Sequence, residues 1–148
     1  MGSVPPAQAL ATIVSDELIL VVEDNDKNLK LVRDLLQFNG FRTLEAGTAA
    51  LGLELAGEYL PNLILMDVQL PDMDGVAALR VLKSDAHTAA IPVVALTAFA
   101  MKEDRERFLN AGFDGYVPKP IDIRQFPAQV RQMIAGSHRG ARPADGTC

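Results

Sequence analysis

Two apolar runs in this sequence end in acidic side chains. The run 63–66 (Leu-Ile-Leu-Met) is followed by Asp67, and the run 18–22 is followed by Glu23 and Asp24. Short continuous apolar runs of this kind are typical of strands that are buried on both faces of a parallel sheet. In α/β proteins, ligands bind in the crevice beyond the carboxyl ends of such strands. The three acids are therefore candidates for metal binding and for chemistry.

Two further polar residues follow strand-like segments. Thr97 ends the apolar run 91–96, and Lys119 comes shortly after the short run 115–117. Because the carboxyl ends of parallel strands meet at one edge of a sheet, we expect Thr97 and Lys119 to lie near the three acids. Neighbouring carboxylates repel one another and raise the pKa of at least one of them, unless a cation joins them.

The chemistry that this residue set predicts is phosphoryl transfer onto the protein itself. A hard divalent cation such as Mg²⁺ takes oxygen ligands and bridges to phosphate oxygens. Asp67, at the end of a rigid strand, is placed as a nucleophile toward phosphorus. Lys119 and the Thr97 hydroxyl can stabilise the charge on the oxygens of the transferred group.

The elements that must position these residues alternate along the chain. Pattern and turn signals predict strands at 18–22, 41–46, 63–67, 91–97 and 115–117, and helices at 27–39, 48–57, 75–84, 102–111 and 122–135. The alternation predicts an α/β fold, a flavodoxin-like (βα)₅ doubly wound parallel five-stranded sheet with strand order 2-1-3-4-5. Its switch point lies between the strands that deliver Asp67 and the pair Glu23 and Asp24.

Several helix residues carry more detailed expectations. Asn25 and Asp26 are expected to cap the first helix, and Phe38 is included in its apolar stripe. Leu51, Leu55 and small alanines are expected to face inward from the second helix. Asp72 and Asp74, in the loop after Asp67, are interpreted as loop and capping acids rather than as metal ligands.

Composition excludes several classes of protein. The net charge is −5 and no long basic run is present, so direct nucleic-acid binding is not expected. The single cysteine, Cys148, allows no disulfide framework, and no apolar run is long enough to span a membrane. We therefore expect a cytoplasmic protein that makes no membrane contact. The length of 148 residues suits one domain, which is expected at 17–136, between a flexible leader at 1–16 and a flexible tail at 137–148.

The motifs together resemble a known family. They are Glu-Asp-Asn at 23–25, Leu-Met-Asp at 65–67, Leu-Pro-Asp-Met-Asp-Gly at 70–75, Thr-Ala at 97–98 and Lys-Pro at 119–120. This set is similar to the receiver domain of two-component response regulators, over about residues 18–135. Within that family, the chain looks most like DivK-type single-domain regulators and the receivers of hybrid histidine kinases.

The resemblance implies a phosphoacceptor and a metal site. Asp67 would accept the phosphoryl group and would also be a ligand of Mg²⁺. Asp24 would bind the metal directly, Glu23 would bind it through water, and the main-chain carbonyl of Gln69 would complete the protein ligands.

The resemblance also implies a phosphate-binding and switch set. Thr97, Ala98 and Lys119 would contact the phosphoryl group, and Tyr116 would be the aromatic residue of the switch. The peptide bond before Pro120 is expected to be cis.

The implied partners are a histidine kinase or a histidine phosphotransferase, and a downstream target protein. Phe99, Met101 and Arg105 are candidates for the target face, and Asn28 and Leu31 for the face that meets the phosphodonor. The chain would be a signalling phosphoacceptor rather than an enzyme, and it would act by protein contact.

Two alternatives stay open at this stage. The chain could be a receiver cut from a hybrid histidine kinase rather than a stand-alone regulator. A Mg²⁺-dependent phosphatase of the haloacid dehalogenase type also uses an Asp after a buried strand, but it needs a second Asp where Gln69 stands here.

Overall fold

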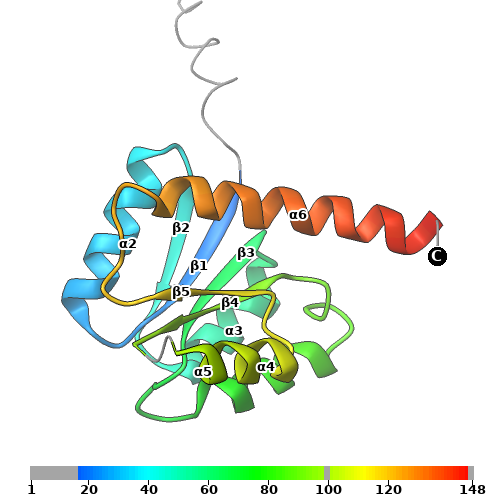
Figure 1. The fold of residues 1–148 in the computed structure, drawn as a ribbon. Coiled ribbons are helices and arrows are strands. Elements are labelled where there is room, and N and C mark those ends of the chain that lie inside the picture. Colours follow the sequence, from blue (N-terminus) through cyan, green and yellow to red (C-terminus); the bar gives the residue numbers. More distant parts are fainter. Residues whose placement is uncertain (1–16, 99–100, 147–148) are drawn as a thin grey trace, which may run out of the picture.

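The structure, a computed structural model, describes residues 17–98 and 101–146, with side chains as far as Gly136. Its strands are β1 (Leu18–Val22), β2 (Arg42–Ala46), β3 (Leu63–Asp67), β4 (Val93–Thr97) and β5 (Gly115–Pro118), and its helices are α2 (Asp26–Phe38), α3 (Ala49–Tyr59), α4 (Gly75–Ser84), α5 (Lys102–Ala111) and α6 (Phe126–Gly146). The strands are all parallel and lie in the order β2-β1-β3-β4-β5 (Figure 1). The predicted fold class and strand order are confirmed.

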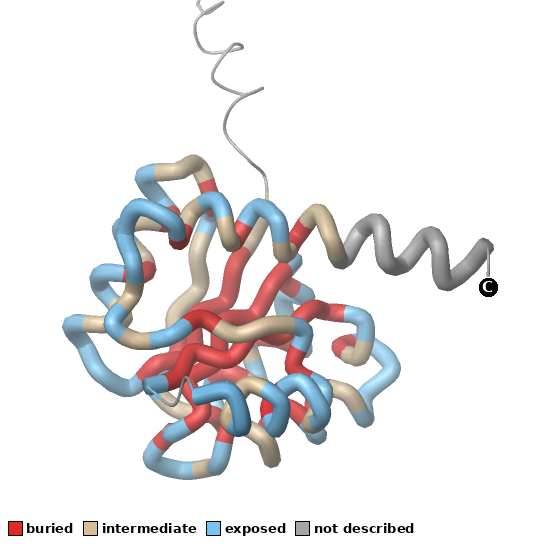
Figure 2. Tube along the Cα trace, in the orientation of Figure 1, coloured by how far each residue is buried: buried red, intermediate tan, exposed pale blue. Residues whose placement is uncertain are grey.

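The sheet is covered by helices on both faces. Alternate strand residues such as Leu20 and Ile64 pack in the cluster that includes residues of α3, α4 and α5. Their neighbours Ile19 and Leu63 pack instead with residues of α2 and α6. The central strands are therefore buried throughout (Figure 2), which explains why they are continuous apolar runs rather than alternating ones.

Helix α3 packs on the sheet through small residues. Ala49, Gly52 and Ala56 are its buried positions, whereas Leu51 is 41% exposed, so the expectation for Leu51 is wrong. A Cβ atom added to Gly52 would lie 2.7 Å from Val22 Cγ2. At Gly52, α3 therefore lies too close to β1 for a side chain, whereas Leu55 packs against the core, as expected.

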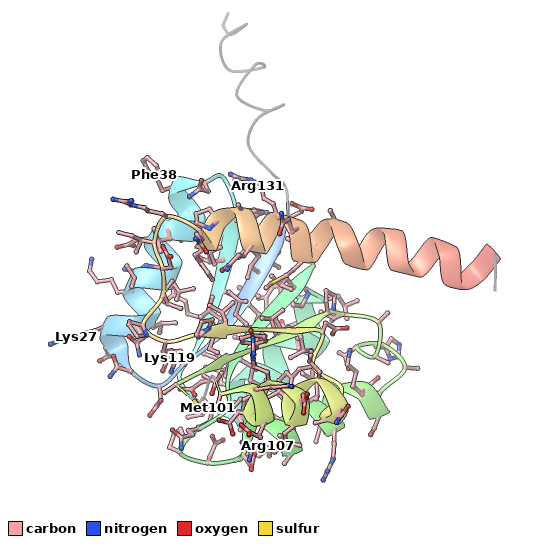
Figure 3. The ribbon with its side chains drawn as sticks, in the orientation of Figure 1. Lys27, Phe38, Met101, Arg107, Lys119 and Arg131 are labelled. Atoms are coloured by element: carbon pink, nitrogen blue, oxygen red, sulfur yellow. The ribbon has the colours of Figure 1, made fainter. Side chains whose placement is uncertain are left out.

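Phe38 is likewise not part of the core. It is 90% exposed (Figure 3), whereas Leu36 is completely buried. Residues two apart on an α-helix point about 200° away from each other. Because Leu36 faces the sheet, Phe38 must face solvent, and its expected place in the apolar stripe is wrong.

The last helix differs from its predicted bounds at both ends. The helix begins at Phe126 rather than at Asp122. Asp122 lies before a turn, in which its carboxylate accepts a hydrogen bond from Arg124 N at 3.0 Å. The helix continues to Gly146 rather than ending at Ala135. Gly136 does not stop it, since a glycine within a helix costs only about 1 kcal/mol relative to alanine. The flexible tail at 137–148 stays a prediction, and the leader at 1–16 lies outside the described residues.

Among the described segments, no helix combines the length and the apolar character that crossing a membrane requires.

Candidate functional site

Three carboxylates meet at the carboxyl edge of the sheet. Asp67 is the last residue of β3 and Glu23 directly follows β1, and these strands are neighbours in the sheet. Glu23 is 1% exposed and Asp67 is 5% exposed, whereas Asp24 is exposed to solvent. One carboxylate oxygen from each of the three residues lies within 4.8 Å of the other two. The structure therefore brings together the acids that the sequence placed on two separate strands.

Lys119 reaches the same place from the end of the edge strand β5. It follows β5, its main-chain N–H donates to Thr97 O at 2.8 Å, and its peptide bond to Pro120 is cis, as the resemblance implied. The Lys119 Nζ atom donates to Asp67 Oδ2 at 3.0 Å and lies 2.8 Å from Glu23 Oε1. One ammonium group thus bridges two buried carboxylates.

These contacts change the protonation of the site. Burial raises the pKa of Glu23, the ion pair with Lys119 opposes this rise, and the neighbouring Asp67 adds to it. Burial by itself lowers the pKa of Lys119, but Glu23 and Asp67 outweigh it, so the pKa of the lysine is raised. The lysine therefore stays charged at neutral pH, and a single positive charge does not balance the acids around it.

The donor set fits a divalent metal ion. Glu23 Oε2 accepts a hydrogen bond from Asn25 N at 3.1 Å, and Glu23 Oε1 is buried with Lys119 Nζ as its charged neighbour at 2.8 Å. Because that one ammonium group is shared with Asp67, three neighbouring carboxylates are left with too little positive charge in the absence of a further cation. Carboxylate oxygens are the ligands that Mg²⁺ prefers, so the residues present suit this ion.

Acidic side chains hold the loop between β3 and α4 in place through four hydrogen bonds. Gln69 N donates to Asp67 Oδ1 at 2.8 Å, and Asp74 accepts from Val76 N at 2.7 Å and so caps α4. The two carboxylate oxygens of Asp72 accept from the first amides of α3, Ala49 N at 2.8 Å and Ala50 N at 2.9 Å. The sequence indicated that Asp72 and Asp74 are loop and capping acids, but it carried no signal that Asp72 caps a helix 23 residues earlier in the chain.

Thr97 and Tyr116 lie on neighbouring strands next to the acids. Thr97 ends β4 and is buried, Ala98 follows it at the surface, and Tyr116 in β5 is half-buried. The Tyr116 hydroxyl accepts a hydrogen bond from Arg105 Nη1 at 2.9 Å, and the guanidinium carbon of Arg105 lies 5.7 Å from the centre of the Tyr116 ring. Sequence reasoning named both residues but missed this pairing, because the spacing of 11 residues joins α5 to β5 across a loop.

Comparison with known proteins gives the family. A family profile described as the response regulator receiver domain matches residues 19–131. The chain belongs to this family. The polar-differentiation response regulator DivK of Brucella ovis is 41% identical over 116 residues, which cover 78% of this chain and 94% of that protein. Receiver domains are signalling phosphoacceptors rather than classical enzymes, and they interact with histidine kinases and downstream targets.

Solved receiver structures share the fold. The receiver domain of the sensor histidine kinase PA1611 from Pseudomonas aeruginosa matches with a TM-score of 0.75 and 30% identity, over 82% of this chain and 99% of that one. That structure holds a magnesium ion coordinated in its active-site cleft. A CheY-like receiver domain protein from Methanospirillum hungatei matches with a TM-score of 0.76 and 28% identity, over 85% of this chain and 99% of that one.

The residues suggested for partner contacts lie on two parts of this receiver domain. Met101, just before α5, is 69% exposed, and Arg105 is half-buried beside Tyr116. On α2, Leu31 is 36% exposed and Asn28 is half-buried. Phe99 lies outside the described residues. The use of these residues in partner contacts stays a prediction.

Proposed function

We propose that this receiver domain accepts a phosphoryl group on Asp67 from a histidine kinase or a histidine phosphotransferase, with Mg²⁺ bound, and signals by phosphorylation-dependent contact with a downstream protein in the cytoplasm. The observation that carries the proposal is the position of the Asp67 carboxylate. It lies within hydrogen-bond distance of Lys119 Nζ and within 4.8 Å of ligand oxygens from Glu23 and Asp24. A nucleophile, a cation and a metal-binding acid pair thus share one site.

Each residue has a role in the proposed transfer. An oxygen of Asp67 forms a bond to phosphorus while the bond from phosphorus to the donor imidazole nitrogen breaks, and that electron pair stays on the nitrogen. Lys119 would neutralise charge on the transferred group, and Thr97 and Ala98 would contact its oxygens. Asp24 and Asp67 would hold Mg²⁺ directly, together with the Gln69 carbonyl, and Glu23 would hold it through water. When bound, the ion supplies further charge neutralisation for the transferred phosphoryl group.

The proposed output begins at Thr97. If its hydroxyl turns toward the new phosphate, the space beside β4 and β5 changes, and Tyr116 can move inward. That movement would break the hydrogen bond from Arg105 to the Tyr116 hydroxyl and alter the face formed by α5 and β5. A local change in charge would thereby become a change in surface shape that a partner protein can bind.

Two observations bear on the context of the domain. Similarity to DivK over 94% of that protein supports a stand-alone regulator. Similarity to the receiver domain of the sensor kinase PA1611 supports the alternative, in which the chain is part of a hybrid kinase. We favour the stand-alone regulator, because the identity to DivK is the higher of the two, at 41% against 30%.

The test is incorporation of acid-labile phosphate from acetyl phosphate, with and without Mg²⁺, in the native chain and in Asp67→Asn. We expect label that requires Mg²⁺ and is absent from the variant. Absence of label in a folded native chain would contradict the proposal and indicate a receiver that signals by binding alone. Label that persists in Asp67→Asn would show that the acceptor is a different residue.

A further inference from the structure

The segment 46–50, which joins β2 to α3, contacts both halves of the acidic site although it contributes no acid to it. The Glu23 main-chain N–H donates to Ala46 O at 2.9 Å. A few residues later, the first two amides of α3 donate to the two carboxylate oxygens of Asp72, at 2.8 and 2.9 Å. The segment therefore connects the residues that follow β1 with the loop that follows β3.

This segment has a fixed position on the sheet. Ala46 is 1% exposed, Ala49 is completely buried, and both belong to the core cluster on the α3 side. In the next turn of α3, a Cβ atom at Gly52 would lie 2.7 Å from Val22 Cγ2. Because such tight packing leaves the helix little room to shift, the start of α3 is fixed relative to β1. The amides that Asp72 contacts are thus a rigid anchor.

The loop 69–74 is closed at its base and is anchored through Asp72. Gln69 and Asp74 pair across the base in an antiparallel bridge. Leu70 is 9% exposed and packs in the core, which holds the first half of the loop. Peptide groups are planar and rotate as units, so a shift of Asp72 in this short closed loop must also rotate the peptide groups that lead back to Gln69. The anchor on α3 therefore influences the orientation of Gln69.

Gln69 supplies the main-chain carbonyl of the proposed metal site. Its N–H donates to Asp67 Oδ1 at 2.8 Å, which fixes the residue on the side of β3. Its carbonyl belongs to the peptide group that continues into the loop toward Asp72. Mg²⁺ requires nearly octahedral ligands at about 2.0–2.1 Å, whereas Ca²⁺ accepts a more flexible geometry. A small rotation of this carbonyl should therefore disfavour Mg²⁺ more than Ca²⁺.

We propose that Asp72 is a positioning residue that makes the metal site selective for Mg²⁺ over Ca²⁺. By tying the loop 69–74 to the start of α3, it holds the Gln69 carbonyl in register with the acids that follow β1. Each Asp72 oxygen accepts its own N–H, so the carboxylate is fixed in orientation as well as in position. The inference rests on the proposed function, because it takes the Gln69 carbonyl as a ligand of Mg²⁺.

The test measures the affinity of the full ¹⁵N-labelled chain for Mg²⁺ alone and for Ca²⁺ alone, from the shifts of its amide resonances. Asp72→Ala should bind Mg²⁺ about tenfold more weakly, and Ca²⁺ at most about twofold more weakly, because Ca²⁺ tolerates a displaced ligand. Asp72→Asn keeps one acceptor oxygen and should show the same change to a smaller degree. Equal weakening of both ions would mean that the lost negative charge sets the affinity, and would overturn the proposal.

Thr48→Ala is the matched control, because Thr48 caps the same helix by accepting from Leu51 N at 3.1 Å, a hydrogen bond that does not involve the loop 69–74. This variant should bind both ions as the native chain does. An equal loss of Mg²⁺ affinity in Thr48→Ala would show that a weakened α3 is the cause and would overturn the proposal. Native Mg²⁺ affinity in Asp72→Ala would also overturn it but would leave the proposed function intact. A native chain that binds no Mg²⁺ would overturn both.

Discussion

At the scale of single residues, the acidic site places two buried carboxylates around one lysine. Lys119 contacts both Glu23 and Asp67, which are almost completely buried. Glu23 Oε1 relies on an ammonium group that it shares with Asp67, and burial raises the pKa of Glu23. A raised carboxyl pKa means that the stability associated with the protonated form is present at low pH and is lost as the pH rises through that pKa. Glu23 by itself therefore contributes less to the stability of the folded state at neutral pH than at low pH.

Replacing Lys119 tests this balance. Without Mg²⁺, Lys119→Met should lower the free energy of unfolding by about 3 kcal/mol at pH 7, because two buried carboxylates lose their cation. The pKa of Glu23 should rise further in the variant, so the deficit should shrink as the pH falls and Glu23 takes up a proton. Urea unfolding at pH 7 and near pH 5 measures this. Lys27→Met, at an exposed position, is the control. If Lys119→Met lost the same free energy of unfolding at both pH values, the explanation would be contradicted.

Gly75 is a second residue on which the site depends. A Cβ atom there would lie 2.6 Å from Val68 Cα and 2.9 Å from the main-chain oxygen of Asp67. Backbone atoms cannot rotate away, so Gly75→Ala should lower the free energy of unfolding by about 1–3 kcal/mol and slow the labelling of Asp67. In Gly57→Ala, within α3, the new methyl meets nothing within 4 Å, so about 0.5–1 kcal/mol of stabilisation is expected. Similar effects in the two variants would rule out the close contact as the cause.

At the scale of elements, the loop between β3 and α4 is connected to three neighbours. The carboxylate of Asp67, at the end of β3, accepts a hydrogen bond from Gln69 N. Asp74 and Asp72 accept hydrogen bonds from main-chain N–H groups at the starts of α4 and α3. The loop also contains the main-chain carbonyl of Gln69, a proposed metal ligand. Its position therefore depends on where α3 begins, although α3 contributes no residue to the acidic cluster.

The contact of Asp72 with α3 should depend on pH. The amides of Ala49 and Ala50 lower the pKa of Asp72 below its ordinary value. A lowered carboxyl pKa stabilises the fold above the unfolded-state pKa of about 3.9, and this contribution is lost as the pH falls through the lowered value. Asp72→Asn should therefore unfold at a lower urea concentration than the native chain at pH 7, and the difference should narrow below about pH 3. If the difference in urea midpoint between the two proteins stayed constant from pH 7 to below about pH 3, the role of the Asp72 charge would be contradicted.

At the scale of the whole molecule, the parallel sheet places the chemistry at one edge. Every described strand runs in the same direction, so the residues at the ends of β3 and β4 and those that follow β1 and β5 meet there (Figure 1). Helices on both faces bury the strands and leave this edge as the place where charged groups reach solvent. The acidic cluster is thus a property of the topology and not of any single segment.

Mg²⁺ should stabilise the whole fold. An ion that binds only the folded chain adds about 2.7 kcal/mol when its concentration is 100 times its dissociation constant. The thermal midpoint of the native chain should therefore rise with Mg²⁺ and return with a chelator. Asp24→Asn should lose most of this rise, whereas Asp85→Asn, in an exposed loop away from the cluster, should keep it. Equal responses of the two variants would mean that Mg²⁺ acts elsewhere on the chain.

The sequence by itself determined the order and type of the elements. Buried strands such as 63–67 are recognisable because both of their faces need apolar residues. Helix starts such as those capped by Asn25 and Asp74 are recognisable because the caps act on amides two or three residues away. Strand order followed from the handedness of parallel crossovers, and so did the meeting of Asp67 with the acids after β1. These signals are local, or they follow from rules that apply to every parallel sheet.

Only the tertiary structure decided which side chains touch. It places Asp72 at the start of α3, and it joins Arg105 to Tyr116. It turns Leu51 to the surface, and it brings α3 so close to β1 that Gly52 has no room for a side chain. Such contacts depend on the distance between elements that are far apart in the chain, which is set by how all their side chains pack together. No local sequence pattern predicts that distance.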